Sequence, residues 1–464
     1  MFKELLPYLN KWFEQADIRG YSIPDSYGTE HLKGHTDKSS GVPSSFKLDA
    51  VFNEFVERMK LNYPFHHPDY AGQMLKPPHP VAWLAYSMAM SVNTNNHALD
   101  GGPPTSDMEK EVVAQIAAMF GYDEAFLGHL TSGGTVANLE ALWVAKNLHP
   151  EKPVLFSTAS HYTHKRMCDV LGVESRAVSL AEDDDFEVRM RAELKNAGSL
   201  VVTMGTTGLG VIEPLDKLIP LCREAGVRIH VDAAYGGFFK LLEDTGLFSP
   251  EPWQLLHKAD SIVIDPHKHG LQPYGCGCVL FKDPAVGRFY KHDSPYTYFS
   301  SDELHLGEIT LECSRAGAAA AALWFTLRCF GLEKSSPFAL MLGDCLKAAR
   351  DFSNRMIKSA SFELFEEPET DIVTYFPKAG SSAEISRLSR TLFNDTMQQG
   401  RSSLYLSLFN VEAADFRKRF PQIIITQAET SVTILRSVFM KPSHLQFTAE
   451  MESRLKASLE RIKR

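Results

Sequence analysis

Five short apolar segments in the middle of the chain constrain its fold more than any other feature. They are "PVLFST" (153–158), "SLVVTMGT" (199–206), "VRIHVDAAYGG" (227–237), "SIVIDPHK" (261–268) and "CGCVLF" (276–281). Stretches with helical periodicity, such as "TVANLEALWVAKNL", separate most of them. Continuous apolar strands alternating with helices are typical of a mostly parallel sheet that helices cover on both faces. We therefore predict an α/β fold whose ligands bind beyond the carboxyl ends of the strands.

The flanking regions predict two further parts of the molecule. Residues 1–85 contain an amphipathic helix, a polar Gly/Ser/Pro stretch and a second helix, which is the pattern of an irregular N-terminal arm. Residues 86–335 would form the large domain. In residues 336–464 a helix, several alternating apolar runs and a terminal helix at about 448–463 predict a small α+β domain. A chain of 464 residues is long enough for two domains.

Charge and composition argue against several classes of protein. The formal net charge of -9, without a basic arm, argues against a nucleic-acid partner. No apolar run approaches the roughly 18 residues of a membrane span, and the N-terminal helix does not have the pattern of a signal peptide. Seven scattered cysteines favour a reduced, cytoplasmic location. Cys276 and Cys278 lack the second pair that a metal site needs, so we expect small strand residues and no metal.

Three features at strand ends point to a particular chemistry. The segment Ser132–Thr135 ("SGGT") precedes a helical stretch and suits a phosphate, although a plain Thr-capped helix explains it as well. Asp232 closes a buried strand and needs a cationic partner, either a structural one or a ligand. Lys268 also follows a strand, where burial can lower its pKa and make it a nucleophile toward a carbonyl. A phosphate cradle, an acid and an amine are the groups that pyridoxal phosphate requires.

At these residues the sequence resembles the group II pyridoxal-phosphate-dependent amino-acid decarboxylases. The matching stretches are "NTNNHALDGGPPTSDMEKEVVAQIAAMFGY", "TSGGTVANLEALWVA", "VDAAYGG", "DPHKHGLQPYG", "DSPYTYF" and "LECSRAGAAAAALW". The resemblance covers about residues 65–335 and implies the fold type I, aspartate aminotransferase-like architecture. It also implies pyridoxal 5′-phosphate as the cofactor and a homodimer whose active sites lie at the subunit interface.

The resemblance implies a role for each matching residue. Lys268 would carry the cofactor covalently, and Asp232 would pair with its pyridine nitrogen. The other implied contacts are Gly134, Thr135, Asp265 and His267 on the phosphate side and His161, Thr207 and Ala234 around the ring. His161 would stack on the ring as part of the catalytic set, although a hydrogen bond to a neighbouring loop is the plainer alternative. Several relatives carry Asn in place of Asp265. Because an ionised acid repels a phosphate, we expect Asp265 to hold nearby backbone or His267.

Tyr296, in "HDSPYTYFSS", is the residue on which the type of reaction depends. It matches the loop tyrosine that would return a proton to the substrate carbon after carbon dioxide leaves. Tyr298 is the alternative donor, and an ordinary loop aromatic is the plainer interpretation. Relatives with phenylalanine at this position tend toward aldehyde products, so the tyrosine favours an amine.

The substrate follows less directly from these motifs. "HPDYAGQM" (67–74) matches the segment that lines the substrate pocket in relatives, which implies substrate contacts for Tyr70 and Gln73. The glutamine favours an acidic amino acid, whereas the remaining motifs look most like microbial tyrosine decarboxylases. We therefore place aromatic substrates, with tyrosine foremost, ahead of glutamate or aspartate. A pyridoxal-phosphate-dependent carbon–carbon lyase or aldolase and a non-catalytic homologue are the remaining alternatives.

Overall fold

The computed structural model describes residues 2–15, 17–18, 21–22, 48–291, 306–426 and 429–464. The chain forms two compact units, residues 1–67 and residues 68–464. The first unit contains helices α1 (Phe2–Gln15) and α3 (Leu48–Met59) and the antiparallel strand pair β1 (Asp17–Ile18) and β2 (Tyr21–Ser22). Helix α1 confirms the helix expected at the N-terminus. The expected division of the chain after residues 85 and 335 remains a prediction.

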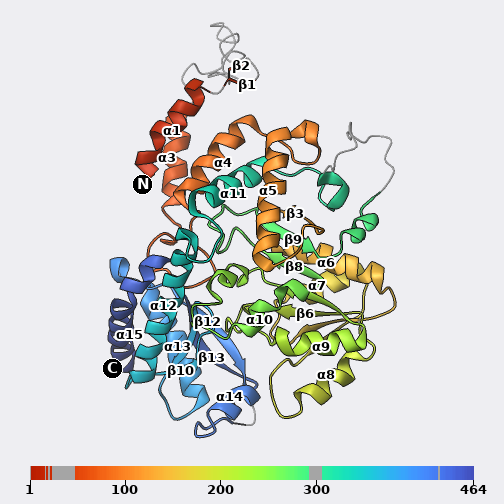
Figure 1. Ribbon diagram of the computed structural model, residues 1–464. Helices are drawn as coiled ribbons and strands as arrows, with labels where there is room; N and C mark the ends of the chain where they lie inside the picture. The colour runs from red at the N-terminus through yellow and green to blue at the C-terminus, as the bar shows by residue number, and fades with distance from the viewer. Residues whose placement is uncertain (1, 16, 19–20, 23–47, 292–305, 427–428) are drawn as a thin grey trace, which may run out of the picture. The chain divides into compact units, whose positions relative to one another are not determined.

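The second unit is built on a seven-stranded sheet with the order β3-β9-β8-β7-β6-β4-β5 (Figure 1). Its strands are β3 (Leu127–Thr131), β4 (Val154–Ser157), β5 (Ser175–Val178), β6 (Ser199–Thr203), β7 (Arg228–Asp232), β8 (Ser261–Ile264) and β9 (Gly277–Phe281). Every neighbouring pair from β8 to β5 is parallel, whereas β9 runs antiparallel to both β8 and β3. The predicted mostly parallel sheet is confirmed.

Helices cover both faces of this sheet, because successive strand residues point to opposite sides. In β8, Ile262 and Ile264 join the core cluster that includes residues of α8 and α9. Val263, between them, joins the cluster beneath α6. The covering helices are α5 (Pro103–Phe120), α6 (Gly134–Leu148), α7 (Thr163–Leu171), α8 (Phe186–Leu194), α9 (Leu215–Ala225) and α10 (Glu251–Gln254). Burial on both faces explains why the central strands are continuously apolar.

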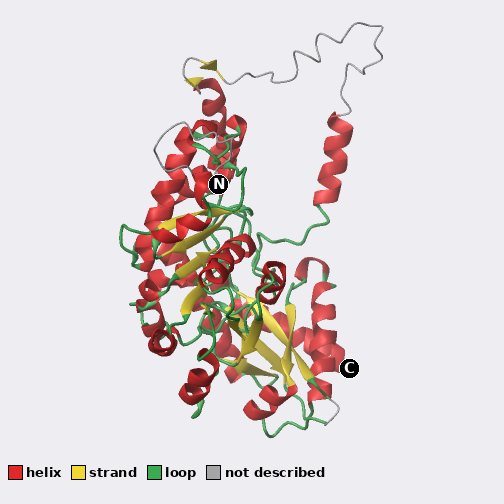
Figure 2. Cartoon of the chain, turned by 90° about the vertical axis from the view of Figure 1, so that its right-hand side faces the viewer, coloured by secondary structure: helices red, strands yellow, loops and turns green. Residues whose placement is uncertain are grey.

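A smaller antiparallel sheet with the order β10-β11-β13-β12 follows in the chain (Figure 2). Its strands are β10 (Phe362–Glu366), β11 (Ile372–Pro377), β12 (Ser407–Glu412) and β13 (Ser431–Val438). The remaining helices of the second unit are α4 (Pro80–Val92), α11 (Gly317–Phe330), α12 (Pro337–Lys358), α13 (Ser382–Met397), α14 (Ala413–Arg419) and α15 (Thr448–Lys463). Helices α12, α13 and α15 pack together beside this sheet. The expected α+β region with a terminal helix is present.

Within the described ranges, no helix combines the length and hydrophobicity of a membrane span. Cys276 immediately precedes β9 and Cys278 is its second residue, and both are buried as free thiols. Among all the residues that the structure describes, no cluster of histidine, cysteine and acidic side chains has the arrangement of a metal site.

Candidate active site

A cavity of about 330 Å³ lies at the ends of β6, β7 and β8. Parallel strands bring their carboxyl ends to one edge of a sheet, so residues distant in sequence meet there. Its volume is within the range of small-molecule sites. Every residue expected to contact the cofactor lines it: Gly134, Thr135, His161, Thr207, Asp232, Ala234, Asp265, His267 and Lys268.

Asp232 is the last residue of β7, and its carboxylate is buried. Its Oδ2 accepts a hydrogen bond from His164 Nε2 at 2.9 Å, and its Oδ1 accepts one from the backbone N–H of Ala234 at 3.1 Å. Burial alone would raise the pKa of Asp232, but the hydrogen bond from His164 and the charge of Lys268 hold the pKa below its ordinary value. The carboxylate is therefore an anion at neutral pH, as a partner for a protonated pyridine nitrogen must be.

Lys268 differs from expectation in its charge. Its Nζ lies 3.0 Å from Oδ2 of Asp265, a residue that follows β8. Burial lowers the pKa of Lys268, but the negative charges of Asp265 and Asp232 outweigh burial and raise it above the ordinary value. The expected lowering was wrong because the sequence did not show that two carboxylates converge on one amine. When no cofactor is attached, the side chain of Lys268 is therefore an ammonium ion at neutral pH.

The glycine-rich segment connects β3 to α6. The N-cap of α6 is Gly133, and no side chain caps the helix, so the Thr-capped alternative is wrong. The first N–H groups of α6 therefore lack a side-chain acceptor, and with the helix dipole they suit an anion. A Cβ on Gly134 would lie 2.6 Å from Asp265 Oδ2, so only glycine fits there without displacing that carboxylate.

Two histidines flank this arrangement. The Nδ1 of His161 lies 2.7 Å from Thr163 Oγ1, which is the neighbouring-loop hydrogen bond considered above, and the side chain also lines the cavity. Burial lowers the pKa of His161, so its ring is neutral at pH 7. His267 donates from Nδ1 to the Cys276 carbonyl at 2.8 Å, and its Nε2 lies 3.5 Å from Asp265 Oδ2. The expected contact between Asp265 and His267 is therefore present, in addition to the ion pair with Lys268.

The expected substrate residues lie apart from the cavity lining. Tyr70 is buried, and its hydroxyl accepts a hydrogen bond from the backbone N–H of Gln73 at 3.3 Å. The Gln73 residue is exposed. Tyr70 also forms a β-bridge with Tyr405, which joins this segment to the region of the small sheet. Substrate contacts for Tyr70 and Gln73 remain predictions.

Arg436, on β13, is a residue that the sequence analysis missed. It is 4% exposed, and its guanidinium donates to the carbonyls of Thr207 at 2.7 Å and Gly208 at 3.0 Å and to that of Gly72 at 3.3 Å. Among the described residues, no carboxylate lies within ion-pair distance of it. A charged residue inside an otherwise uncharged strand ("TILRSV") was the available signal, because burying a charge costs free energy unless a partner compensates for it.

Asp371 is a second residue that the sequence analysis missed, and it connects the small sheet to the lining of the cavity. Asp371, which precedes β11, accepts a hydrogen bond from the hydroxyl of Tyr235, a residue that lines the cavity. Its Oδ2 lies 3.2 Å from Nε2 of His269, the neighbour of Lys268. Asp371 therefore connects a residue of the cavity lining with the residue that follows Lys268.

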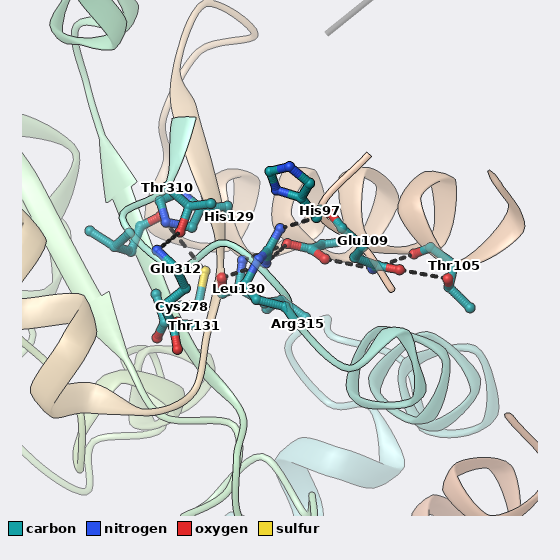
Figure 3. Close-up of polar contacts among 12 residues, drawn as sticks. His97, Thr105, Glu109, His129, Leu130, Thr131, Cys278, Thr310, Glu312 and Arg315 are labelled. Carbon is teal, nitrogen blue, oxygen red and sulfur yellow. Dashed lines mark hydrogen bonds and ion pairs between the residues drawn. The ribbon is translucent and has the colours of Figure 1, made fainter. Parts of the chain in front are cut away.

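Behind the glycine-rich segment, a buried ion pair joins α5 to the chain that follows residue 305 (Figure 3). Arg315 Nη1 lies 2.5 Å from Glu109 Oε1 and donates to the Leu130 carbonyl at 2.7 Å. Glu312 accepts a hydrogen bond from the backbone N–H of Ser132 at 2.8 Å. These contacts hold the end of β3 and the start of the glycine-rich segment in place.

Tyr296 and Tyr298 lie outside the described residues, so their expected role remains a prediction. The residues that are described fit pyridoxal phosphate by their chemistry. One cavity combines an amine, a carboxylate held as an anion, and a helix N-terminus without a side-chain cap. These groups suit an aldehyde, a pyridine nitrogen and a phosphate, respectively.

Comparisons with known proteins agree with this chemistry. Residues 63–378 match the family model described as the pyridoxal-dependent decarboxylase conserved domain. A protein of Methanothermobacter thermautotrophicus named "Probable L-tyrosine/L-aspartate decarboxylase" is 31% identical, over 66% of this chain and 82% of the relative. The aspartate 1-decarboxylase of Aliivibrio fischeri is 30% identical, over 80% of this chain and 74% of the relative.

The fold is also similar to that of solved structures. The crystal structure of Oryza sativa TDC with PLP and tryptamine has a TM-score of 0.75 and covers 99% of this chain and 97% of its own. The two sequences are 15% identical, so this likeness concerns the fold. The fold type I architecture implied by the motifs is confirmed.

Proposed function

Since this chain belongs to the pyridoxal-dependent decarboxylase family and is an amino-acid carboxy-lyase with pyridoxal 5′-phosphate as its cofactor, we propose that its substrate is an acidic L-amino acid, with L-aspartate foremost. The observation that carries this proposal is the buried guanidinium of Arg436, which has no carboxylate partner in the described part of the chain. Both relatives described above have aspartate in their names.

The surroundings of Arg436 favour an anionic ligand. A buried cation without a counterion loses the free energy of its hydration, and carbonyl oxygens compensate for only part of that loss. Burial lowers the pKa of Arg436, and the charge of Asp371, which forms no ion pair with it, offsets only part of this effect. Its shortest hydrogen bond goes to the carbonyl of Thr207, a residue that lines the cavity. The side-chain carboxylate of aspartate would supply the missing charge and distinguish this substrate from uncharged amino acids.

L-Tyrosine is the second candidate, and it was the first from the sequence alone. Tyr70 belongs to the segment that the resemblance links to the substrate, and its ring lies 6.2 Å from that of Tyr405. Such a pair offers apolar and hydroxyl contacts to an aromatic side chain. The relative from Methanothermobacter has both amino acids in its name. The carbon–carbon lyase alternative has no comparable support, because the matched family is one of decarboxylases.

We assign the residues of the cavity the following roles. Lys268 would attach the cofactor, which when bound accepts the electrons of the bond broken to the substrate's α-carboxylate. Asp232, held as an anion by His164, would keep a proton on the ring nitrogen. The uncapped start of α6, with Gly134 and Thr135, would hold the phosphate, assisted by His267. His161, neutral at pH 7, and Ala234 would contact the ring, and Thr207 would lie near its hydroxyl.

The product and the assembly belong to the same proposal. Tyr296, with Tyr298 as the alternative, would return a proton to the α-carbon and release an amine. A homodimer is proposed because the resemblance implies active sites at a subunit interface. Light scattering of the purified holoenzyme tests this, with a monomer contradicting it. A cytoplasmic location stays a prediction.

The substrate proposal is tested by measuring carbon dioxide release from L-aspartate, L-glutamate and L-tyrosine. We expect carbon dioxide release from L-aspartate. The variant Arg436→Lys should raise the KM for L-aspartate by about tenfold or more and change the KM for L-tyrosine far less. Arg390→Met, which removes an arginine of α13 that bonds to Thr433, is the control. Release from tyrosine alone would contradict the proposal. An equal rise in KM for both substrates would instead assign Arg436 to the α-carboxylate that they share.

A further inference from the structure

Asp265 is a buried carboxylate whose two oxygen atoms have unequal surroundings. Its Oδ2 lies 3.0 Å from Lys268 Nζ and 3.5 Å from His267 Nε2. Its Oδ1 has no hydrogen-bond partner among the described residues, although the residue is only 2% exposed. A carboxylate that is buried with half of its acceptor capacity unused is costly. Its contact with the amine therefore calls for a functional explanation.

The structure around Asp265 holds this carboxylate against the amine. On one side, a Cβ on Gly134 would lie 2.6 Å and 2.8 Å from its two oxygens, so the backbone at the start of α6 packs closely against it. The positive end of the dipole of that 15-residue helix stabilises a negative charge there. The cation nearest to its Oδ2 is Lys268.

Asp232 does not play the same part: its oxygens accept hydrogen bonds from His164 and from the N–H of Ala234, and the ion pair of Lys268 is with Asp265. Asp265 is thus the carboxylate in direct contact with the amine. The charges of Asp265 and Asp232 together raise the pKa of Lys268 against the effect of burial. The other titratable groups that act on Lys268 are Tyr274, His161, His267 and His269.

We propose that Asp265 is the counterion of Lys268: it holds the amine as an ammonium ion whenever the cofactor is not attached, and so determines the pH above which attachment is fast. This inference rests on the proposed role of Lys268. Attachment forms a bond between the lysine nitrogen and the aldehyde carbon of the cofactor and releases one molecule of water. Because the nucleophile is the neutral amine, the ammonium ion must first give a proton to solvent. An amide at position 265 would remove the charge that retains this proton.

The test follows cofactor attachment to cofactor-free protein by the change in cofactor absorbance between pH 6 and pH 10. In the wild type, the rate should rise with pH throughout this range, because the pKa of Lys268 lies above its ordinary value. In Asp265→Asn, this rise should be displaced to lower pH by roughly one unit, so that attachment near pH 7 becomes about tenfold faster. Asp216→Asn, on α9, is the control, because this acid does not line the cavity. An unchanged attachment rate near pH 7 in Asp265→Asn overturns the proposal.

Two further measurements separate this proposal from the assigned role of Lys268. In Lys268→Ala, attachment should be lost, and attachment at the wild-type rate would contradict the role of the lysine itself. Competitive acetylation of the cofactor-free wild type needs no variant and remains available if Asp265→Asn does not fold. Lys268 should label with an apparent pKa above that of the exposed Lys152. An apparent pKa below that of Lys152 would falsify the counterion role.

Discussion

His164 Nε2 lies 2.9 Å from Asp232 Oδ2, and both residues are buried. The histidine comes from α7 and the acid from the end of β7, so the contact joins a helix to the sheet edge that forms the cavity. Its consequence is electrostatic. The hydrogen bond opposes the effect of burial and keeps the pKa of Asp232 below its ordinary value.

The variant His164→Ala should bind the cofactor about tenfold more weakly, because a buried carboxylate that loses a hydrogen bond costs about 1–3 kcal/mol. The loss of cofactor affinity should grow as the pH falls from 7 to 5, because the pKa of Asp232 is higher in this variant and its carboxylate is protonated at a higher pH. The wild type should change little over this range. Titration of cofactor-free protein with pyridoxal phosphate at each pH measures the effect. His257→Ala, away from the cavity lining, is the control, and equal affinities in both variants would contradict the prediction.

Tyr296→Phe should keep the cofactor and bind substrate but form amine about 10²-fold more slowly, as expected for loss of a general acid. Separate assays of amine and aldehyde product, together with carbon dioxide release, measure the change. Tyr298→Phe is the matched control, because the two tyrosines are the competing donors. If Tyr298→Phe shows the loss and Tyr296→Phe does not, the two roles must be exchanged.

Glu213 should make the protein less stable as the pH rises. Its side chain is buried and accepts a hydrogen bond from the backbone N–H of Thr203. Burial raises the pKa of Glu213 from 4.5 to about 7. The folded state therefore retains a proton that the unfolded state loses, and stability falls as the pH increases between about 4.5 and 7. Glu213→Gln removes this dependence, which amounts to at most about 3 kcal/mol.

Urea unfolding of wild type and Glu213→Gln at pH 5 and pH 8 measures this difference. The variant should gain stability relative to the wild type at the higher pH. The control Glu460→Gln, at an exposed position on α15, should have the same free energy of unfolding as the wild type at both pH values. A constant difference between wild type and Glu213→Gln would show that Glu213 does not titrate in this range.

The buried pair of Glu109 and Arg315 should respond more strongly to a single substitution than to a double one. Arg315→Met leaves Glu109 as a buried charge without its cation and should reduce the free energy of unfolding by about 3–5 kcal/mol. The double variant Glu109→Gln, Arg315→Met should recover part of this loss, because both charges are absent. Urea unfolding of the wild type, Arg315→Met, Glu109→Gln and the double variant measures the coupling, and additive effects of the two substitutions would contradict it.

The sequence identified the strands at the centre of the large sheet but missed those at its edges. Strands β4, β6, β7 and β8 are buried along their whole length, so their sequences are continuously apolar. The missed strands β3, β5 and β10 are all at an edge of their sheets. In β5, for example, Arg176 is exposed, and a polar edge strand has no pattern that distinguishes it from a loop.

The same reasoning applies to the site. Residues at the ends of parallel strands and in the glycine-rich segment could be found from the chain, because strand order and local chemistry imply that they meet. Other features depend on side chains that come from separate elements. They are the charge on Lys268, the hydrogen bond between His164 and Asp232, and the hydrogen bond from Arg436 to the carbonyl of Thr207. Their electrostatic consequences follow from distances of about 3 Å. Such distances arise only when the large sheet, its helices and the smaller sheet pack together.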